Sequence, residues 1–545
     1  MDGRKVLELY DKMRVDRGNM ENLWQDAIRY CLPYERRSWD EFGGNDTTPG
    51  KRRASPVCSL PVLYASRLAA ALHNSAFPSN SYWFDFGFAG DDGKGDSELR
   101  RWCREARDKV HFRIRSGTNF YQESHTMVLG LVVLGTAGFY TYYKNGSLRF
   151  RYIPIHKNFY IARNSDGDID MAAILHEYTA KEAVEEYGGA VSERVKSAML
   201  RSYDGVEKFR YVQLIYPKTP FGEKWDAAKG GKPYGDVTVE QDTGRVVRRG
   251  GHRRFPFAVS RFMMASDDLY GRSPAMNAMS DIKSINVLRK NLLEASLRAI
   301  KPAVFINSLI GQPVSLASGA LNRVPNFDPN SIWTFPQPTN FPVGNDLMME
   351  LRESLIQAFY IDVFQAVEQQ DRMTATEVTE RVRQKVEAIA SVVSRLQREF
   401  SRSVVLRCLD LLIENGEIEP PPLSADMKNF DISFMSSLDA MIQQGVASQT
   451  MTFIMQATSV AQAVAANPDF DNVVDTDAVL RRLADCNMLP ESFFRPRAET
   501  ERRRAEAAEA AANATSAQSE ALSAKAMLDY AKADQIAGGG SYNGI

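Results

Sequence analysis

The sequence predicts an α+β fold that is mostly helical. Apolar residues recur every three or four positions up to about residue 125 and again after residue 273, which is the period of a helix with one buried face. Between residues 138 and 262, aromatic and β-branched residues alternate with polar ones, which indicates strands joined in hairpins. With 545 residues, the chain is long enough for three or four domains of about 150 residues each.

Two helices and a helix-to-strand segment are expected in the first 143 residues. One helix begins near Leu7 and ends near Pro33, and a second runs from Pro61 along an alanine-rich face until Pro78 stops it. The most apolar stretch, Met127 to Tyr143, is short for a membrane span and is interrupted by three glycines. We therefore expect a buried helix that turns into a strand.

The strand-rich region contains several turn signals. The sequences NGS, NSDGD and DTGR are typical of turns between hairpin strands. A short helix from Ala180 to Tyr187 is predicted within this region, because Gly188-Gly189 follows its last helical residue. The region should therefore consist of hairpins interrupted by one small helix.

Two further helices flank a proline-rich insert. Ser273 is a suitable N-cap and Pro274 suits the first helical position, so one helix should run to Ile300, where a Lys-Pro sequence ends it. Residues 302–345 are rich in Pro, Asn and Phe and predict strands and turns. Helical periodicity resumes at residue 347 and is broken near Gln369.

A long helix follows. Thr374 and Glu377 form a T-x-x-E capping box, in which each side chain bonds the other residue's backbone N–H. This helix should continue to Asn415-Gly416, where glycine supplies a left-handed cap. About forty residues at about 1.5 Å each give a rod of roughly 60 Å, which few compact enzymes need.

Two or three more helices are expected between residues 437 and 500. The segment from Ala498 to about Ile536 is dominated by Ala, Glu, Arg and Ser, so it favours a helix by propensity but offers few large apolar residues. Because most helical stability comes from packing, this helix should pack against copies of itself or remain partly frayed.

The charge balance limits the classes of partner. Lysine plus arginine count 67 and aspartate plus glutamate 68, which gives a net charge of −1. This cancellation argues against a protein that coats nucleic acid or binds membranes through a polybasic surface. The five cysteines form no CxxC unit and indicate buried thiols in a reducing compartment. The N-terminus lacks the apolar core of a signal peptide, so we expect a protein that is soluble and intracellular when made.

The sequence contains none of the enzyme motifs considered in complete form. Gly231-Lys232 is followed by Pro233 instead of the Ser or Thr of a phosphate-binding loop, and no GxSxG or HExxH motif is present. Asp166, Asp168 and Asp170 have the spacing of a calcium loop, but Met171 stands where the sharp turn needs glycine, so a hairpin turn is the better interpretation. We predict no catalytic residues, no metal and no cofactor, and hence no enzyme.

Several segments, in order, resemble the head-to-tail connecting (portal) proteins of short-tailed, podovirus-type bacteriophages. Residues 71–86 (ALHNSAFPSNSYWFDF) and 134–143 (LGTAGFYTYY) are similar to the family's helix with an aromatic strand and to its glycine-rich junction. FYIARNSDGDID followed by HEYTAKEAVEEYG matches its hairpin and helix. The most specific motifs are DLYGRSP, residues 268–274, and DRMTATEV, residues 371–378. The family positions in these two motifs are Gly271, Arg272, Ser273, Pro274, Thr374 and Glu377.

This resemblance covers about residues 5 to 500 and implies the portal fold, with wing, stem, clip, crown and a C-terminal helical barrel, assembled into a ring. The implied parts are residues 1–271 for the first part of the wing, 272–300 for the first stem helix, 301–345 for the clip, 346–368 for the second stem helix, 369–374 for the channel loop, 375–436 for the long helix and the return to the wing, 437–500 for the crown and 501–545 for the alanine-rich helix and tail.

The resemblance also implies a function. A homo-oligomer, a dodecamer in this family, would sit at one capsid vertex of the virion, after assembly in the host cytoplasm. Double-stranded DNA would pass through its channel without sequence recognition during packaging and ejection. The implied protein partners are the terminase large subunit, a tail adaptor protein, the major capsid and scaffolding proteins, and internal core proteins.

A near-neutral composition suits a channel through which DNA slides, because each phosphate contact adds affinity that would become drag. Arg372 at the tip of the channel loop, with Asp371 beside it, is the first candidate for a DNA-facing residue; an ion pair with a neighbouring subunit is the alternative. Lys283, Lys290 and Lys301 are further candidates, with an exposed helix flank as the alternative. The basic clusters at residues 51–53, 248–249, 253–254 and 502–504 are interpreted as solvated faces or intersubunit ion pairs.

Two other functions remain open at this point. An internal core or ejection protein of the virion also uses long helices and alanine-rich tails, but it would lack the stem–clip–stem order. A packaging-associated nuclease would show divalent-metal-dependent cleavage of DNA.

Overall fold

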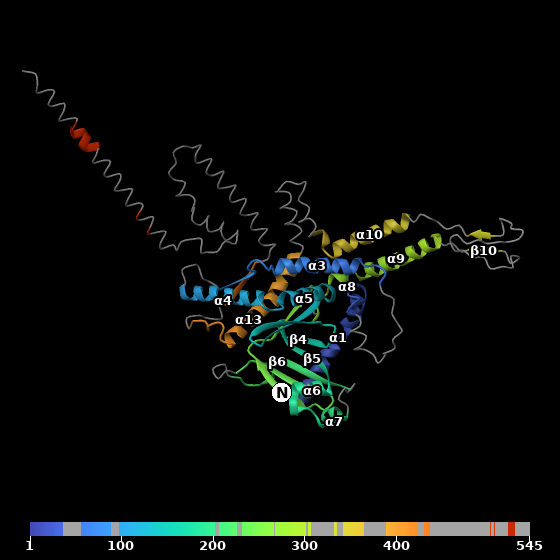
Figure 1. The fold of residues 1–545 in the computed structure, drawn as a ribbon, viewed down its shortest axis with the longest axis horizontal. Helices are drawn as coiled ribbons and strands as arrows, with labels where there is room; N and C mark the ends of the chain where they lie inside the picture. The colour runs from blue at the N-terminus through green and yellow to red at the C-terminus, as the bar shows by residue number, and fades with distance from the viewer. Residues whose placement is uncertain are drawn as a thin grey trace, which may run out of the picture. The chain divides into compact units, whose positions relative to one another are not determined.

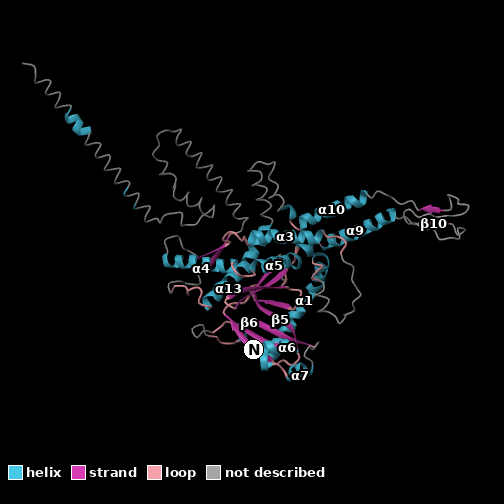
Figure 2. Cartoon of the chain, in the orientation of Figure 1, coloured by secondary structure: helices cyan, strands magenta, loops and turns pink. Residues whose placement is uncertain are grey.

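The computed structural model describes residues 1–35, 56–88, 97–201, 207–225, 231–265, 268–300, 304–306, 332–334, 342–363, 389–422, 430–435, 502, 506 and 522–528 (Figure 1). The chain divides into two compact units, Met1–Asp439 and Ala440–Ile545. Nearly all described residues belong to the first unit; in the second, residues 522–528 are helical. The described part mixes helices and strands, as the sequence predicts (Figure 2).

The described residues up to 134 contain four helices: α1 (Gly3–Cys31), α3 (Leu60–Ala76), α4 (Ser97–Arg115) and α5 (Phe120–Leu134). The limits of α1 and α3 agree with the proline positions used to predict them. At the end of α5, Gly135 adopts a left-handed conformation with φ 75°, and β2 (Thr136–Lys144) follows directly. The predicted turn from buried helix to strand is therefore confirmed.

The strands between residues 136 and 261 form two antiparallel sheets. The three-stranded sheet has the order β3-β2-β9, with β3 at Ser147–Ile153 and β9 at Phe257–Arg261. The five-stranded sheet has the order β4-β5-β6-β7-β8. Its strands are β4 (Phe159–Arg163), β5 (Ile169–Thr179), β6 (Lys208–Pro217), β7 (Tyr234–Glu240) and β8 (Val246–His252).

The predicted hairpin turns lie where the sequence places them. Asn145 and Gly146 join β2 to β3 with φ values of 52° and 73°, as a two-residue hairpin loop requires. At the turn between β4 and β5, the Asn164 side chain accepts hydrogen bonds from the backbone N–H groups of Asp166 (3.0 Å) and Asp168 (2.9 Å). This confirms a hairpin turn in place of a calcium loop.

The predicted small helix is α6 (Ala180–Tyr187), which begins at a capping box between Thr179 and Glu182. A second small helix, α7 (Glu193–Arg201), follows it, and both pack on β5 and β6 around buried residues of their own. On another set of sheet residues, Val6, Tyr10 and Met13 of α1 pack against β4 to β7. The five-stranded sheet thus carries two small hydrophobic clusters.

The main core is rich in aromatic side chains. Phe120 of α5 lies against Phe77, Phe139 and Phe150, with ring centroids 5.7, 6.1 and 5.2 Å apart. Phe400 contacts Phe77 and Phe139 from a helical segment more than 260 residues further along the chain. These contacts join the N-terminal helices, the three-stranded sheet and the helical segment around Phe400 into one core.

The helix predicted from Ser273 to Ile300 consists of two helices, α8 (Pro274–Asn277) and α9 (Met279–Ile300), with a break at Ala278. Two short strands, β10 (Val304–Ile306) and β11 (Ile332–Thr334), pair antiparallel within the proline-rich insert. α10 (Pro342–Ala358) follows.

The helix after the insert begins earlier than predicted and has a break that was not predicted; its expected end near Gln369 lies outside the described residues. α10 begins at Pro342 instead of residue 346, since proline lacks the N–H that the first turn leaves unbonded. α10 ends at Ala358, where the fully buried Phe359 is followed by Tyr360 with a left-handed φ of 52°. Only residues 361–363 of the stretch after this break are described, and they are helical.

The long helix predicted from Thr374 to Gly416 is confirmed over its described part. Residues 389–396 are helical, a π-helical turn, η5 (Gln397–Ser401), follows, and α13 (Arg402–Glu414) continues the helix. Gly416 has a φ of 73°, as the predicted left-handed cap requires. β12 (Phe430–Phe434) then pairs antiparallel with β1 (Phe84–Phe88). The π-helical turn was not predicted.

Candidate functional site

The helices α9 and α10 flank the proline-rich insert, and α9 carries candidate DNA-facing lysines. The two helices pack side by side (Figure 1). The Ser354 hydroxyl donates to Asp281 Oδ2 at 2.5 Å near the start of α9. Towards the other end of the pair, Gly344 approaches Leu292 so closely that an added Cβ would lie 2.9 Å from Leu292 Cδ2. Residue numbers therefore rise along α9 as they fall along α10, so the helices are antiparallel.

The apolar face predicted for α9 is buried only along its first half. Met279, Ile282 and Ile285 are buried. Beyond them, several large apolar residues of the pair are exposed to solvent. On α9 these are Val287, Leu293, Leu297 and Ile300, with exposed fractions of 56, 50, 62 and 74%, and on α10 they are Val343, Leu347 and Met349, with 79, 44 and 60%.

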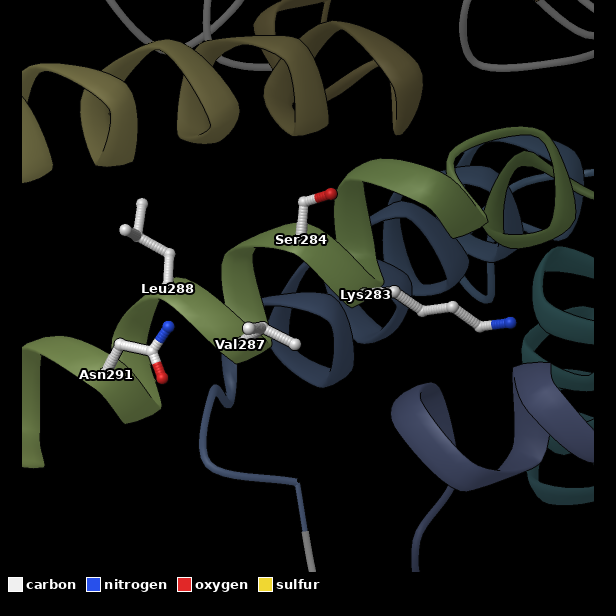
Figure 3. Close-up of a pocket in the computed structure, with 5 residues that line it drawn as sticks. All are labelled: Lys283, Ser284, Val287, Leu288 and Asn291. Atoms are coloured by element: carbon white, nitrogen blue, oxygen red, sulfur yellow. The ribbon is translucent and has the colours of Figure 1, made fainter.

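An open groove lies on α9, lined by Lys283, Ser284, Val287, Leu288 and Asn291 (Figure 3). Ser284 and Leu288 point towards α10, whereas Lys283 extends sideways towards α1. There the Lys283 ammonium pairs with Asp26 Oδ2 at 2.6 Å. One wall of this groove is therefore apolar, and its cation is partly neutralised by a carboxylate of the same chain.

The other predicted DNA-facing residues divide into two groups. Lys290 lies on α9 with a side chain 63% exposed and only a loose contact of 3.9 Å with Glu294. Lys301, Asp371 and Arg372 lie outside the described residues, so their predicted role is unchanged. Among the five candidates, the structure places Lys283 and Lys290 on the same helix.

The DLYGRSP motif joins the body of the fold to α8 through two glycines. A Cβ on Gly271 would lie 2.4 Å from the carbonyl oxygen of Gly135, and a Cβ on Gly135 would lie 2.3 Å from the carbonyl oxygen of Gly271. The Gly271 N–H donates to Thr136 Oγ1 at 2.8 Å. The two backbones can approach this closely only because neither residue has a side chain.

Ser273 extends this junction. Its hydroxyl donates to the carbonyl of Val133 at 2.7 Å and accepts from the Met276 N–H at 3.0 Å, so it caps α8 as predicted and also ties the cap to α5. Pro274 occupies the first helical position. Arg272 pairs with Asp268 at 3.1 Å within the same motif. Thr374 and Glu377 of the second motif lie outside the described residues.

Tyr270 anchors the motif from its other side. Its ring lies edge-on to Trp24, with centroids 5.2 Å apart, and Trp24 Nε1 donates to the Leu134 carbonyl at 3.0 Å. Both aromatic side chains are buried. The start of the helix pair is therefore held by α1, α5 and β2 together.

Asn286 is a positioning residue that the sequence did not reveal. Its side-chain oxygen accepts from the backbone N–H groups of Val57 and Cys58 at 2.8 and 3.0 Å, which ties the segment before α3 to α9. These partners are more than 220 residues away in sequence. No local pattern marks such a contact.

Several predicted surface charges form ion pairs within the chain. Arg248 pairs with Glu186 at 3.1 Å, and Arg254 pairs with Asp410. The side chains of Cys31, Cys58, Cys103 and Cys408 are buried, and burial raises the pKa of the Cys31 thiol to about 12. Within the described ranges, no group of His, Cys, Asp and Glu has the arrangement of a metal site. No described helix has the length and apolar character needed to cross a bilayer.

Comparison with known proteins identifies what this architecture is similar to. A family model described as bacteriophage head to tail connecting protein matches residues 4–494. A probable portal protein of Bordetella phage BPP-1 is 22% identical over 460 residues, which cover 82% of this chain and 80% of the relative.

Proposed function

The chain belongs to the bacteriophage head-to-tail connecting protein family, and we propose that it forms the portal ring of a virion. In this proposal a homododecamer occupies one capsid vertex, and double-stranded DNA passes through its central channel during packaging and ejection. The ring docks the terminase large subunit and later a tail adaptor. Major capsid, scaffolding and internal core proteins surround it, and assembly takes place in the host cytoplasm.

The observation that carries the proposal is the antiparallel pair α9–α10, with the proline-rich insert between its helices and exposed apolar residues along both. We assign α8–α9 and α10 to the two stem helices and the insert to the clip. A monomeric protein rarely exposes so many large apolar side chains on one pair of helices, so the pair needs a partner. Neighbouring subunits of a ring would supply it.

The charges of the helix pair are consistent with a channel through which DNA slides. α9 holds four cations and two acids, and α10 holds one cation and three acids. The two helices together are therefore neutral, and Lys283 is already paired with Asp26. A wall of this kind offers DNA few phosphate contacts, which keeps the friction on moving DNA low.

Electron microscopy and mass measurement of the purified full-length protein test the ring directly. A dodecamer of the 61.1 kDa chain has a mass of about 730 kDa, and we expect particles of this size with a central pore. A protein that remains a 61.1 kDa monomer under all assembly conditions would contradict the proposal.

Arg372 offers a test of the channel. Replacing Arg372 with alanine should leave ring assembly intact while reducing packaging or retention of DNA, because a phosphate contact at the channel loop is lost. DNA retention in assembled heads measures the effect, and ring mass is the control. If assembly itself fails, Arg372 acts at the subunit interface and does not face DNA.

A further inference from the structure

α4 carries a concentrated positive charge. Its 19 residues include seven lysines and arginines and three aspartates and glutamates, a net charge of +4 in a chain whose total is −1. One face of the helix is firmly packed: Trp102, Ala106, Val110 and Ile114 are buried, and Trp102 Nε1 donates to the Glu419 carbonyl at 2.9 Å. The remaining cations are thus held on a helix of fixed orientation.

Most of these cations already have partners. Arg107 pairs with Asp85 and Asp108 at 3.3 and 3.0 Å. Arg113 pairs with Glu417 at 2.5 Å. Lys109 and Arg115 differ, since neither has a carboxylate within ion-pair distance in the described part of the chain. Both side chains are exposed.

Between these two cations lies an exposed aromatic residue. Phe112 is 63% exposed, and Lys109 and Arg115 are three positions before and after it, on the same face of the helix. Tyr82 lies beside this face, 45% exposed, with the Arg107 guanidinium 4.6 Å from the centre of its ring and the His111 ring 4.7 Å away. Exposed aromatics among arginines are typical of residues that dominate protein–protein interfaces.

The composition of this face favours a protein partner over nucleic acid. Phe112 offers an apolar contact that a phosphate backbone does not use. The expected partner is therefore an acidic protein segment that also carries apolar side chains.

We propose that the exposed face of α4, formed by Lys109, Phe112 and Arg115, docks the acidic segment 468–480 of a second copy of this chain. The segment, PDFDNVVDTDAVL, contains four aspartates, no lysine or arginine, and the apolar residues Phe470, Val473 and Val474. The segment lies outside the described residues, so the proposal uses only its amino-acid composition. The inference rests on the proposed ring, in which each subunit meets its neighbours through two different faces.

A charge exchange in the full-length protein tests this contact. K109E/R115E and, separately, D475K/D477K should each raise the protein concentration at half-assembly by about tenfold, measured by sedimentation velocity. The quadruple variant that carries both pairs should restore assembly, because the charges attract again. K12E/R14E, a reversal of two exposed cations on α1, is the matched control and should assemble like the wild type.

Phe112→Ser tests the apolar part of the same contact. Since Phe112 is mostly exposed, the variant should keep its circular dichroism spectrum and thermal midpoint as a subunit while assembly weakens in the same direction. Loss of the folded spectrum would assign Phe112 to the fold, and the charge exchange then decides the proposal alone.

Two results would overturn the inference. The first is K109E/R115E assembling like the wild type, or a quadruple variant no better than either pair. The second is loss of DNA binding by K109E/R115E while assembly stays normal. Fluorescence anisotropy with a labelled duplex of about 20 base pairs measures this binding, and its loss would make DNA the ligand of this face. If the wild type itself forms no ring, the proposed function fails instead.

Discussion

Gly135 and Gly271 meet backbone to backbone where the body of the fold passes into α8. Sequence inspection marked Gly271 as part of a motif and Gly135 as part of a helix-to-strand junction, but their separation of 136 positions concealed that they touch. The requirement for glycine at each position comes from the other one. The need for glycine at both positions therefore arises from the tertiary contact. Gly135 also ends α5, and Gly271 also belongs to the DLYGRSP motif.

Replacing Gly271 with alanine should lower the free energy of unfolding by at least about 2 kcal/mol, because the new Cβ overlaps the Gly135 carbonyl oxygen and backbone must move. Chemical denaturation monitored by circular dichroism measures the change. Gly18→Ala is the matched control: nothing lies within 4 Å of its added Cβ, and it should stabilise α1 by about 0.5–1 kcal/mol. Equal effects of the two substitutions would contradict the close approach.

Two buried histidines make stability depend on pH. Burial, helped by His125, lowers the pKa of His73 to about 4. Burial, helped by Lys157 and Arg17, lowers the pKa of His156 to about 3. In an unfolded chain both titrate near pH 6.5, so acid protonates the unfolded state first. Stability is complete above about pH 6.5 and is lost as the pH falls towards the folded pKa values, by up to about 1.4 kcal/mol per pH unit for each histidine.

The thermal midpoint should therefore fall between about pH 7 and about pH 5, before most carboxylates titrate. His73→Gln keeps a hydrogen-bonding group near Ser124 Oγ, 2.9 Å from His73 Nε2, and removes one titration. Its midpoint should change less over the same interval. A wild-type midpoint that is constant across this interval would show that neither histidine resists protonation.

At the scale of elements, the π-helical turn η5 decides where the long helix is attached. Glu399 accepts from the Arg261 backbone N–H at 2.8 Å and from Arg261 Nε and Nη2 at 3.1 and 2.7 Å. The adjacent Phe400 is fully buried between Phe77 and Phe139. A π-helical turn inserts a residue into the helical repeat, which lets neighbouring side chains reach β9 and the core from one turn.

Glu399→Ala should destabilise the protein by about 3–5 kcal/mol, because it leaves the Arg261 guanidinium, whose side chain is only 8% exposed, without its carboxylate. Denaturant unfolding measures the loss. Glu193→Ala removes an ion pair of the same length, 2.7 Å, from a side chain 82% exposed, and should change stability by less than about 1 kcal/mol. Comparable losses for both variants would mean that burial does not set the value of these pairs.

For the whole molecule, the exposed apolar residues of α9 and α10 make the described chain an incomplete unit. Leu297 and Val343 are 62 and 79% exposed on these two helices. Leu200 is even more exposed, at 88%, but it lies on the small helix α7, which packs against α6. If the α9–α10 surface contacts neighbouring subunits and Leu200 does not, substitutions on the two surfaces should affect ring assembly differently.

Leu297→Glu and Val343→Glu together should leave the subunit folded but shift particles from ring mass towards the 61.1 kDa monomer, because charges replace apolar contacts between copies. Mass photometry gives the distribution, and circular dichroism confirms folding. Leu200→Glu, the matched control, should form rings like the wild type. Full assembly of the double variant would place the subunit contacts elsewhere.

Local signals in the sequence sufficed for much of the fold. The limits of α6, the Ser273 cap, the Asn145-Gly146 hairpin and the left-handed Gly416 each depend on a few adjacent residues, so propensity and turn chemistry predict them. The family resemblance rests on ordered motifs of the same kind, and the family comparison confirms it. The mixed fold class follows from the two hydrophobic periods.

Long-range contacts decided the rest. The break at Tyr360, the π-helical turn, the pairing of Lys283 with Asp26 and the clamp formed by Asn286 each depend on residues far apart in the chain. Hydrophobic periodicity indicates that one face of a helix is apolar, but it does not indicate which other part of the protein packs against that face. Neighbouring residues encode local backbone geometry, whereas burial and ion pairing depend on which distant atoms the folded chain brings together.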